Sequence, residues 1–134
     1  MDSRFTGNAC SNGAALSSIG VSWTVLNCRF TGNRAIGIGA NPAGPGTPGG
    51  GSGGAIYNDG DRMTLSIGGS VFTDNHANEG GGAIFFVSDD RTGTMAIRDS
   101  ALEDNPNDRF HTPGLPGIYF LGARPPTITD SVLR

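Results

Sequence analysis

The chain has 134 residues, a length that suits one domain, and its formal net charge is -3, with every basic residue an arginine. It contains no run of basic residues, so the sequence does not predict nucleic-acid binding. No apolar stretch approaches membrane-spanning length. The N-terminus has neither the charged nor the apolar region of a signal peptide.

A repeat runs through the chain, and each copy is marked by a large apolar anchor. The anchors are Phe5, Phe30, Phe72, Leu102 and Leu133, and the first four are followed three residues later by asparagine. Successive anchors lie 25, 42, 30 and 31 residues apart, a period typical of stacked repeats. Because the 3.6-residue apolar periodicity of helical repeats is absent, the copies are predicted to be rungs of a β-solenoid.

Each rung begins with an alternating strand before the anchor, at 21–25, 63–67 and 94–97. In this strand Leu65 and Ile67 share one phase, so they are expected to point inward while Ser and Thr point outward. The anchor forms a second strand. After it, a glycine-rich start leads into a third, apolar strand at 12–16, 53–57, 81–86 and 116–120. The sequence therefore predicts three short strands per rung.

An odd number of residues separates the alternating strand from the anchor, so a bend must intervene if both are to face the core. The residues at this point tolerate a left-handed backbone: Asp2, Asn27, Gly69, Asp99 and Asp130. The next position is always small: Ser3, Cys28, Ser70, Ser100 and Ser131. We expect these small side chains to stack, and the anchor asparagines to form a second ladder that satisfies backbone groups at a turn.

Phe-x-x-Asn followed by Gly-Gly-Ala-Ile resembles the repeats of polymorphic outer-membrane protein passengers and of secreted β-helix proteins of the pectate-lyase-like superfamily. The resemblance covers nearly the whole chain except residues 34–52. It implies an all-β fold, a right-handed parallel β-helix of about four rungs, and a secreted or cell-surface location. Since no signal peptide is present, we expect the chain to be a segment of a longer exported protein, or else to work where it is made. Adhesins, polysaccharide lyases and hydrolases all use this architecture, so it does not by itself predict a function.

We expect residues 1–134 to form a single β-helix domain, uncapped at both ends, with a Pro/Gly-rich loop inserted at 34–52. The two ends stop at the same point of the repeat. Self-association through at least one end is therefore expected, with a closed homodimer favoured over a filament. Cys10 and Cys28 occupy different repeat positions, so two small buried thiols are expected, and a disulfide stays open.

Acidic residues and histidines follow the anchors. Asp74 and Asp104 hold the same position on adjacent rungs, so their backbones should lie about 4.8 Å apart. His76 and Glu79 follow on one rung and His111 on the next. Carboxylates held this close raise one another's pKa, as acid–base pairs and divalent metal sites require. These five residues are the candidate catalytic set of a small hydrolase, metal-dependent or carboxylate-based, acting on ester or glycosidic substrates; a solvated acidic turn is the alternative.

A second acidic group lies at the corners after the glycine-led strands. Asp59 and Asp61 should stack near Asp89 and Asp90, and these carboxylates are candidate ligands for calcium or another divalent metal. Asp and Gly are also ordinary turn residues. No other cofactor is predicted, because the glycine-rich segments lack the Gly-Lys-Ser/Thr sequence of phosphate-binding loops.

The outward phase of the alternating strands forms two rows of small side chains: Ser22, Thr24, Thr64, Ser66, Thr94, Ala96 and Thr127. Such a flat face resembles that of β-helical ice-binding proteins, and a sugar or another sheet would fit it equally. Solvent-facing strands also favour Thr without any function. The sequence contains no nucleophile motif. The favoured function is a structural or polysaccharide-contacting solenoid, with the hydrolase and ice binding as alternatives.

Overall fold

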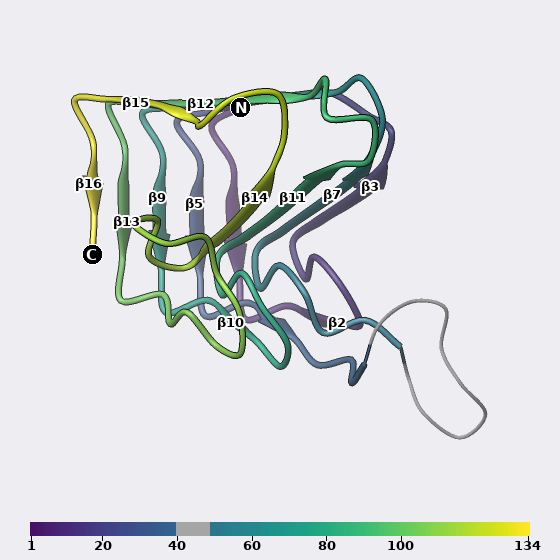
Figure 1. Cartoon of the computed structure of the whole chain (residues 1–134). Helices are drawn as coiled ribbons and strands as arrows, with labels where there is room; N and C mark the ends of the chain where they lie inside the picture. The colour runs from purple at the N-terminus through teal and green to yellow at the C-terminus, as the bar shows by residue number, and fades with distance from the viewer. Residues whose placement is uncertain (40–48) are drawn as a thin grey trace.

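The computed structural model describes residues 1–39 and 49–134, and these residues form short β-strands and no helix. Every strand pairing is parallel. Figure 1 shows the rungs stacked along one axis, with the first rung at one end and the last at the other. The parallel β-helix predicted from the repeat is confirmed. None of the described residues belongs to a helix that could cross a membrane.

Four parallel sheets make up the walls of the β-helix. The anchor sheet contains β1 (Arg4–Thr6), β5 (Arg29–Thr31), β9 (Val71–Thr73), β13 (Ala101–Glu103) and β16 (Val132–Leu133). The short sheet contains β2 (Ala9–Cys10), β6 (Arg34–Ala35) and β10 (His76–Ala77). The glycine-led sheet contains β3 (Leu16–Ile19), β7 (Ile56–Gly60), β11 (Ile84–Ser88) and β14 (Ile118–Leu121). The alternating sheet contains β4 (Trp23–Leu26), β8 (Thr64–Gly68), β12 (Thr94–Arg98) and β15 (Thr127–Thr129).

The three predicted strands of each rung are present, and three rungs contain a fourth. The strands of the short sheet are only two residues long and lie between the anchor and the glycine-led strand. A two-residue strand is too short to show alternation, so its sequence carries no periodic signal. In the last rung, the carboxylate of Asp108 takes the place of this strand by accepting a hydrogen bond from the backbone N–H of Ala77.

The predicted bend between the alternating strand and the anchor is confirmed. Asp2, Asn27, Gly69, Asp99 and Asp130 all have left-handed φ angles, between 48° and 59°. The small side chains that follow form the predicted ladder. In it, the backbone N–H groups of Cys28, Ser70 and Ser100 donate to the hydroxyl oxygens of Ser70, Ser100 and Ser131, at 3.0–3.1 Å.

The asparagine ladder is confirmed as well. The backbone N–H groups of Asn8, Asn33 and Asn75 each donate to the side-chain oxygen of the asparagine on the next rung, at 3.1 Å. Their side-chain amides donate to the same oxygens at 2.8–2.9 Å. Both donors of each residue are thus satisfied in a place where an unpaired polar group would be costly.

The core is a set of apolar stacks between these ladders. Phe30 lies between Phe5 and Phe72, with ring centroids 4.8 and 4.4 Å apart, and all three rings are nearly parallel. Phe30 and Phe72 are fully buried, as the inward phase predicts. Leu102 and Leu133 continue the stack through their register with Phe72.

The Gly-Gly pair that precedes the glycine-led strand has two separate steric roles. Gly53 has a φ angle of 67°, which other residues rarely adopt. A Cβ atom on Gly54 would overlap the carbonyl oxygen of Gly82 on the next rung. Both glycines are therefore needed for the rungs to stack.

In the structure, the inserted segment is shorter than the range 34–52 expected from the sequence. Arg34–Ala35 forms β6, Ser52 bridges to Gly80, and Gly51 donates its N–H to Ser11 and accepts one from Glu79. These residues make rung contacts, although the Pro/Gly composition of the segment predicts a loop. The Pro-Gly tract at 40–48 lies outside the described residues.

A loop between β13 and β14 covers part of the outer edge of β14. Leu115 packs against the core, and Thr112 lies along the outer edge of β14. There the N–H of Thr112 donates to the carbonyl oxygen of Ile118, and its hydroxyl accepts the N–H of Phe120. In Figure 1 this loop crosses in front of the last rung. Sequence periodicity missed it because a covering loop does not repeat.

The two cysteines are free thiols. Cys28 is buried in the small-residue ladder, where its thiol donates to the carbonyl oxygen of Leu26 at 3.2 Å. Cys10 is exposed, so the expectation that both thiols are buried is wrong for this residue. It lies on β2, in the first rung of the short sheet, where no outer strand covers it.

Candidate functional site

The structure brings together two members of the acid–histidine set. Asp74 and His76 lie on either side of Asn75, and Nε2 of His76 is 2.8 Å from Oδ1 of Asp74. Asp74 has a φ angle of 54° and Asp104 one of 57°, so both occupy the same left-handed turn on adjacent rungs. All three residues are at least partly exposed. This arrangement provides a solvated histidine–carboxylate pair with a second carboxylate on the neighbouring turn.

Glu79 and His111 are not in contact with the Asp74–His76 pair in any interaction found among the described residues. Oε1 of Glu79 accepts the backbone N–H of Gly39 at 3.1 Å and faces Nη1 of Arg109 at 3.3 Å. His111 is half-buried in the loop that covers the last rung. Asp108, an acid of the next rung that the sequence analysis left outside the candidate catalytic set, interacts with the charge of His76. Burial raises the pKa of Asp108, and the hydrogen bond from Ala77 and the charge of His76 oppose that rise.

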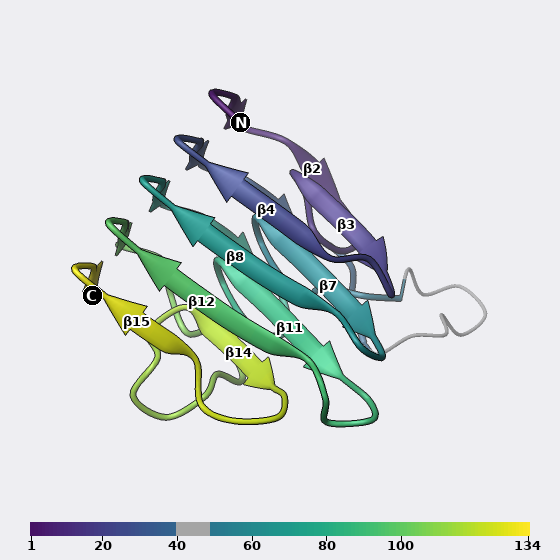
Figure 2. The same ribbon diagram turned by 90° about the horizontal axis from the view of Figure 1, so that it is seen from above.

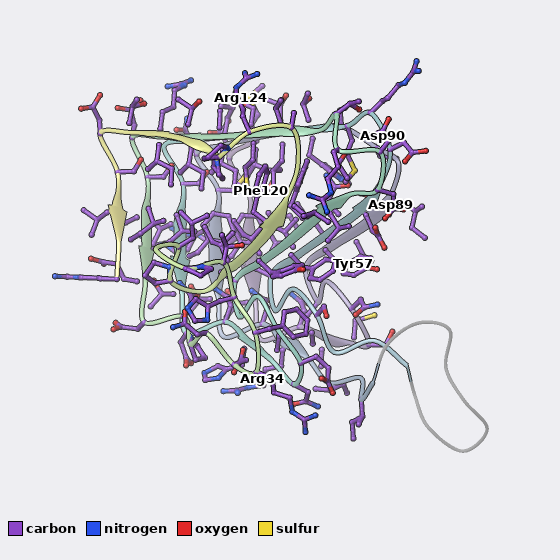
Figure 3. All side chains as sticks on the ribbon, in the orientation of Figure 1. Arg34, Tyr57, Asp89, Asp90, Phe120 and Arg124 are labelled. Atoms are coloured by element: carbon purple, nitrogen blue, oxygen red, sulfur yellow. The ribbon has the colours of Figure 1, made fainter. Side chains whose placement is uncertain are left out.

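The acidic corners behave mainly as turns. Oδ1 of Asp90 accepts hydrogen bonds from Thr92 and Ser88, and those from Thr92 are the main reason that its pKa is lowered. Asp89 and Asp61 are exposed, and Figure 3 shows Asp89 and Asp90 at the same outer corner. Oδ2 of Asp59 accepts the hydroxyl proton of Tyr57 at 2.7 Å. Over residues 1–39 and 49–134, no group of three or more His, Cys, Asp or Glu side chains is placed to hold a metal ion.

The two outward rows of the alternating sheet have the predicted register. Thr24, Ser66, Ala96 and Thr127 are neighbours across four strands, and Thr64 is next to Thr94. Ser22 extends the second row, because its hydroxyl accepts the backbone N–H of Thr64. Figure 2 looks onto this sheet, whose strands lie side by side. The rows offer small hydroxyl and methyl groups, and no ionisable group belongs to them.

An aromatic row on the outer face of the glycine-led sheet was missed in the sequence. Tyr57, Phe85 and Tyr119 are in register on β7, β11 and β14, and their rings stack with centroids 4.9 and 5.3 Å apart. Phe110 packs edge-on against Phe85 and Tyr119, at 6.3 and 4.9 Å. The signal was available, because each member of the row directly follows the isoleucine that begins the strand.

One end of this row opens into a cavity of about 270 Å³. Its aromatic walls are Tyr57, Phe85 and Phe110, and its polar walls include Asp59 and Glu79. Tyr57 is buried, Phe85 is half-buried, and Phe110 is 36% exposed. Figure 3 shows Tyr57 on the side of the β-helix that also carries the Asp89–Asp90 corner. The cavity therefore joins one carboxylate from each of the two acidic sets with an aromatic surface.

Two segments of the chain match the family model of the Chlamydia polymorphic membrane protein repeat, at residues 27–59 and 69–87. Each match begins at the left-handed bend, passes through the anchor and the Gly-Gly pair, and ends in β7 or β11. No curated protein and no solved structure gives a significant match. The likeness to the pectate-lyase-like superfamily stays a prediction. The chain thus contains, on a parallel β-helix, two consecutive repeats similar to those of the polymorphic membrane proteins of Chlamydia.

Proposed function

We propose that this chain is a cell-surface β-helix segment that binds a polysaccharide through the cavity formed by Tyr57, Phe85 and Phe110. The repeat match supports the surface location, since the family is one of membrane proteins. The observation that carries the binding function is an aromatic row on the outside of the β-helix, beside two carboxylates.

The chemistry of the cavity suits a sugar. Sugar rings present C–H groups on their faces and hydroxyl groups around their edges, so they pack on aromatic rings and donate to nearby oxygens. Phe110 and Phe85 supply partly exposed ring surface, and Asp59 and Glu79 supply acceptors. The volume of about 270 Å³ is at the low end for small-molecule sites, so the cavity suits a short part of a chain.

The aromatic surface is held in place before a ligand arrives. The Phe110 ring lies on Gly80, where a Cβ atom would overlap it, and it packs against Phe85 and Tyr119. Arg109 and Gly39 fix the Glu79 carboxylate. A preorganised site loses less conformational entropy on binding. Rigid placement thus favours binding by a small cavity.

Affinity electrophoresis through gels containing dextran, xylan or chitosan will test this function. At least one polymer should retard the wild type. Phe110→Ala should be retarded less, with a Kd about tenfold or more higher than that of the wild type. Val132→Ala, a truncation of an exposed apolar residue on the anchor sheet, is the control and should behave as wild type. Asp59→Asn tests the polar wall without removing ring surface. Equal retardation of wild type and Phe110→Ala, with both folded by circular dichroism, would contradict the proposal.

A hydrolase is the second candidate, because His76 and Asp74 are already in contact at 2.8 Å. In it, Asp74 would orient the imidazole and His76 would act as the general base. Release of reducing ends from the same polymers, and of p-nitrophenol from p-nitrophenyl acetate, should be measured with and without EDTA. Activity that His76→Ala abolishes would support the hydrolase; sensitivity to EDTA would indicate a metal. Turnover at the level of buffer alone would rule out both versions for these substrates.

A further inference from the structure

Two arginines lie side by side without a counter-charge on the outer face of the anchor sheet. Arg4 on β1 and Arg29 on β5 are register partners, so their backbones are about one strand spacing apart, near 4.8 Å. Both side chains are exposed. Like charges placed directly opposite each other destabilise a sheet. The fold therefore keeps an unfavourable pair at this position.

No carboxylate on the sheet neutralises the pair. The same row continues with Val71, Ala101 and Val132, which carry no charge. Within residues 1–39 and 49–134, none of the close ion pairs includes Arg4 or Arg29. Glu103, the acid in the row of Thr73 on the same sheet, pairs with Arg134. The guanidinium groups of Arg4 and Arg29 are thus available to an external anion.

The arginines line a groove of about 340 Å³ where the chain bends from the alternating sheet into the anchor sheet. Its floor is formed by the left-handed turn residues Asn27 and Gly69 and by the small-residue ladder. Asp2 is the one carboxylate in its lining, against two arginines. The hydroxyl of Ser3 and the thiol of Cys28 already donate to backbone carbonyls. The free donors of this groove are therefore chiefly those of the two guanidinium groups.

We propose that this groove binds an oxyanion group, a sulfate or carboxylate, on an acidic sugar polymer. Each guanidinium carries five N–H donors in a planar fork that matches such groups. An anion between Arg4 and Arg29 also removes their mutual repulsion. The groove is built from different sheets than the aromatic cavity, so this site does not rest on the proposed function. A polymer with repeated charges would use it better than a single ion, because neighbouring groups raise the effective concentration at the groove.

The test compares dextran sulfate with neutral dextran as ligands for the full chain. The wild type should bind dextran sulfate, and the double variant Arg4→Gln/Arg29→Gln should bind it roughly tenfold or more weakly, as expected when charge-assisted hydrogen bonds are lost. Arg124→Gln is the matched control. Arg124 is also exposed and forms none of the close ion pairs found among the described residues, but it lies in the turn between β14 and β15, outside the groove. Figure 3 labels it. It should bind within twofold of the wild type.

A second measurement separates the polymer from the free ion. Inorganic sulfate stabilises most proteins through the solvent, so its effect on Tm must be compared between wild type and the double variant at equal ionic strength. A larger rise in the wild type shows that the groove takes the anion itself. Equal binding of dextran sulfate by wild type, the double variant and Arg124→Gln would overturn the proposal. Equal binding of neutral and sulfated dextran would overturn it too.

Discussion

Substitution of one asparagine in the buried ladder should destabilise the protein more than the same substitution at the end of the ladder. Asn75 is fully buried. Its side-chain oxygen accepts both donors of Asn33, and its amide donates to the carbonyl oxygen of Phe30 and to the side-chain oxygen of Asn105. In Asn75→Ala, the backbone N–H of Asn33 and the carbonyl of Phe30 both lose a partner.

The expected cost follows chiefly from the first of these groups. The carbonyl of Phe30 keeps its ladder pairing with β9, so the N–H of Asn33 is the group left without a partner. A buried polar group in that state costs about 1–3 kcal/mol, so Asn75→Ala should lower the free energy of unfolding by at least about 1–3 kcal/mol. A domain of this length is stable by roughly 7–20 kcal/mol. Asn8 is exposed, and among the described residues its side chain makes one hydrogen bond, to Asn33. After the substitution, the backbone N–H of residue 8 still donates to the side-chain oxygen of Asn33. Asn8→Ala should therefore cost about 1 kcal/mol or less.

Urea denaturation will measure both free energies of unfolding. It should be followed by circular dichroism at about 218 nm, close to the usual minimum in the spectrum of β-strands. The two variants have the same chemical change at the same repeat position, so they differ chiefly in burial and number of hydrogen bonds. The slope of the free energy against urea should stay near the wild-type value if the unfolded states are alike. Equal costs for Asn75→Ala and Asn8→Ala would refute the view that the ladder stabilises the core.

Further predictions concern the core, the rung spacing, the pKa of Asp108 and assembly. Phe72→Ala removes a fully buried ring stacked on Phe30 and should cost roughly 3–5 kcal/mol; a Tm within a few degrees of wild type would show that the ring is not in the core. Gly54→Ala forces a Cβ atom into the backbone of the next rung and should prevent folding, whereas Gly7→Ala, with open space at a left-handed position, should cost about 1 kcal/mol, as soluble yield and urea denaturation will show. Partial burial raises the pKa of Asp108, so the folded state holds that proton to higher pH than the unfolded chain does, and this carboxyl lowers stability as the pH rises above its usual pKa of 3.8. Asp108→Asn removes this contribution, so the change in Tm from pH 3 to pH 7 should be more positive than in the wild type, and an identical change would contradict the assignment. Self-association through the end rungs stays a prediction: light scattering should show a mass that grows with concentration, and a constant monomer mass would exclude it.

Much of the fold was predictable because the same structural requirement recurs at the same position in several copies of a stacked repeat. The anchor stack, the left-handed bend and both ladders recur in nearly every copy, so Phe30, Asn27 and Asn75 could be assigned to their places by comparing copies. One occurrence of a residue such as Asp99 is ambiguous; five turn-forming residues at one repeat position are not. Periodicity also determined the inward and outward phases, since alternate residues of a strand face opposite sides.

Features that occur once depended on the tertiary structure. The loop that carries Thr112 and Leu115 covers the last rung through contacts that no other copy makes. Glu79 and Asp59 lie 20 residues apart in sequence and were assigned to different acidic groups, yet the rung geometry puts both in one cavity. Phe110 completes that cavity by crossing from the loop onto Gly80. The sequence by itself determined the repeated cross-section, because every rung must satisfy the same backbone hydrogen bonds; only the folded chain decided which side chains from different rungs meet, because their lateral packing depends on loops that do not repeat.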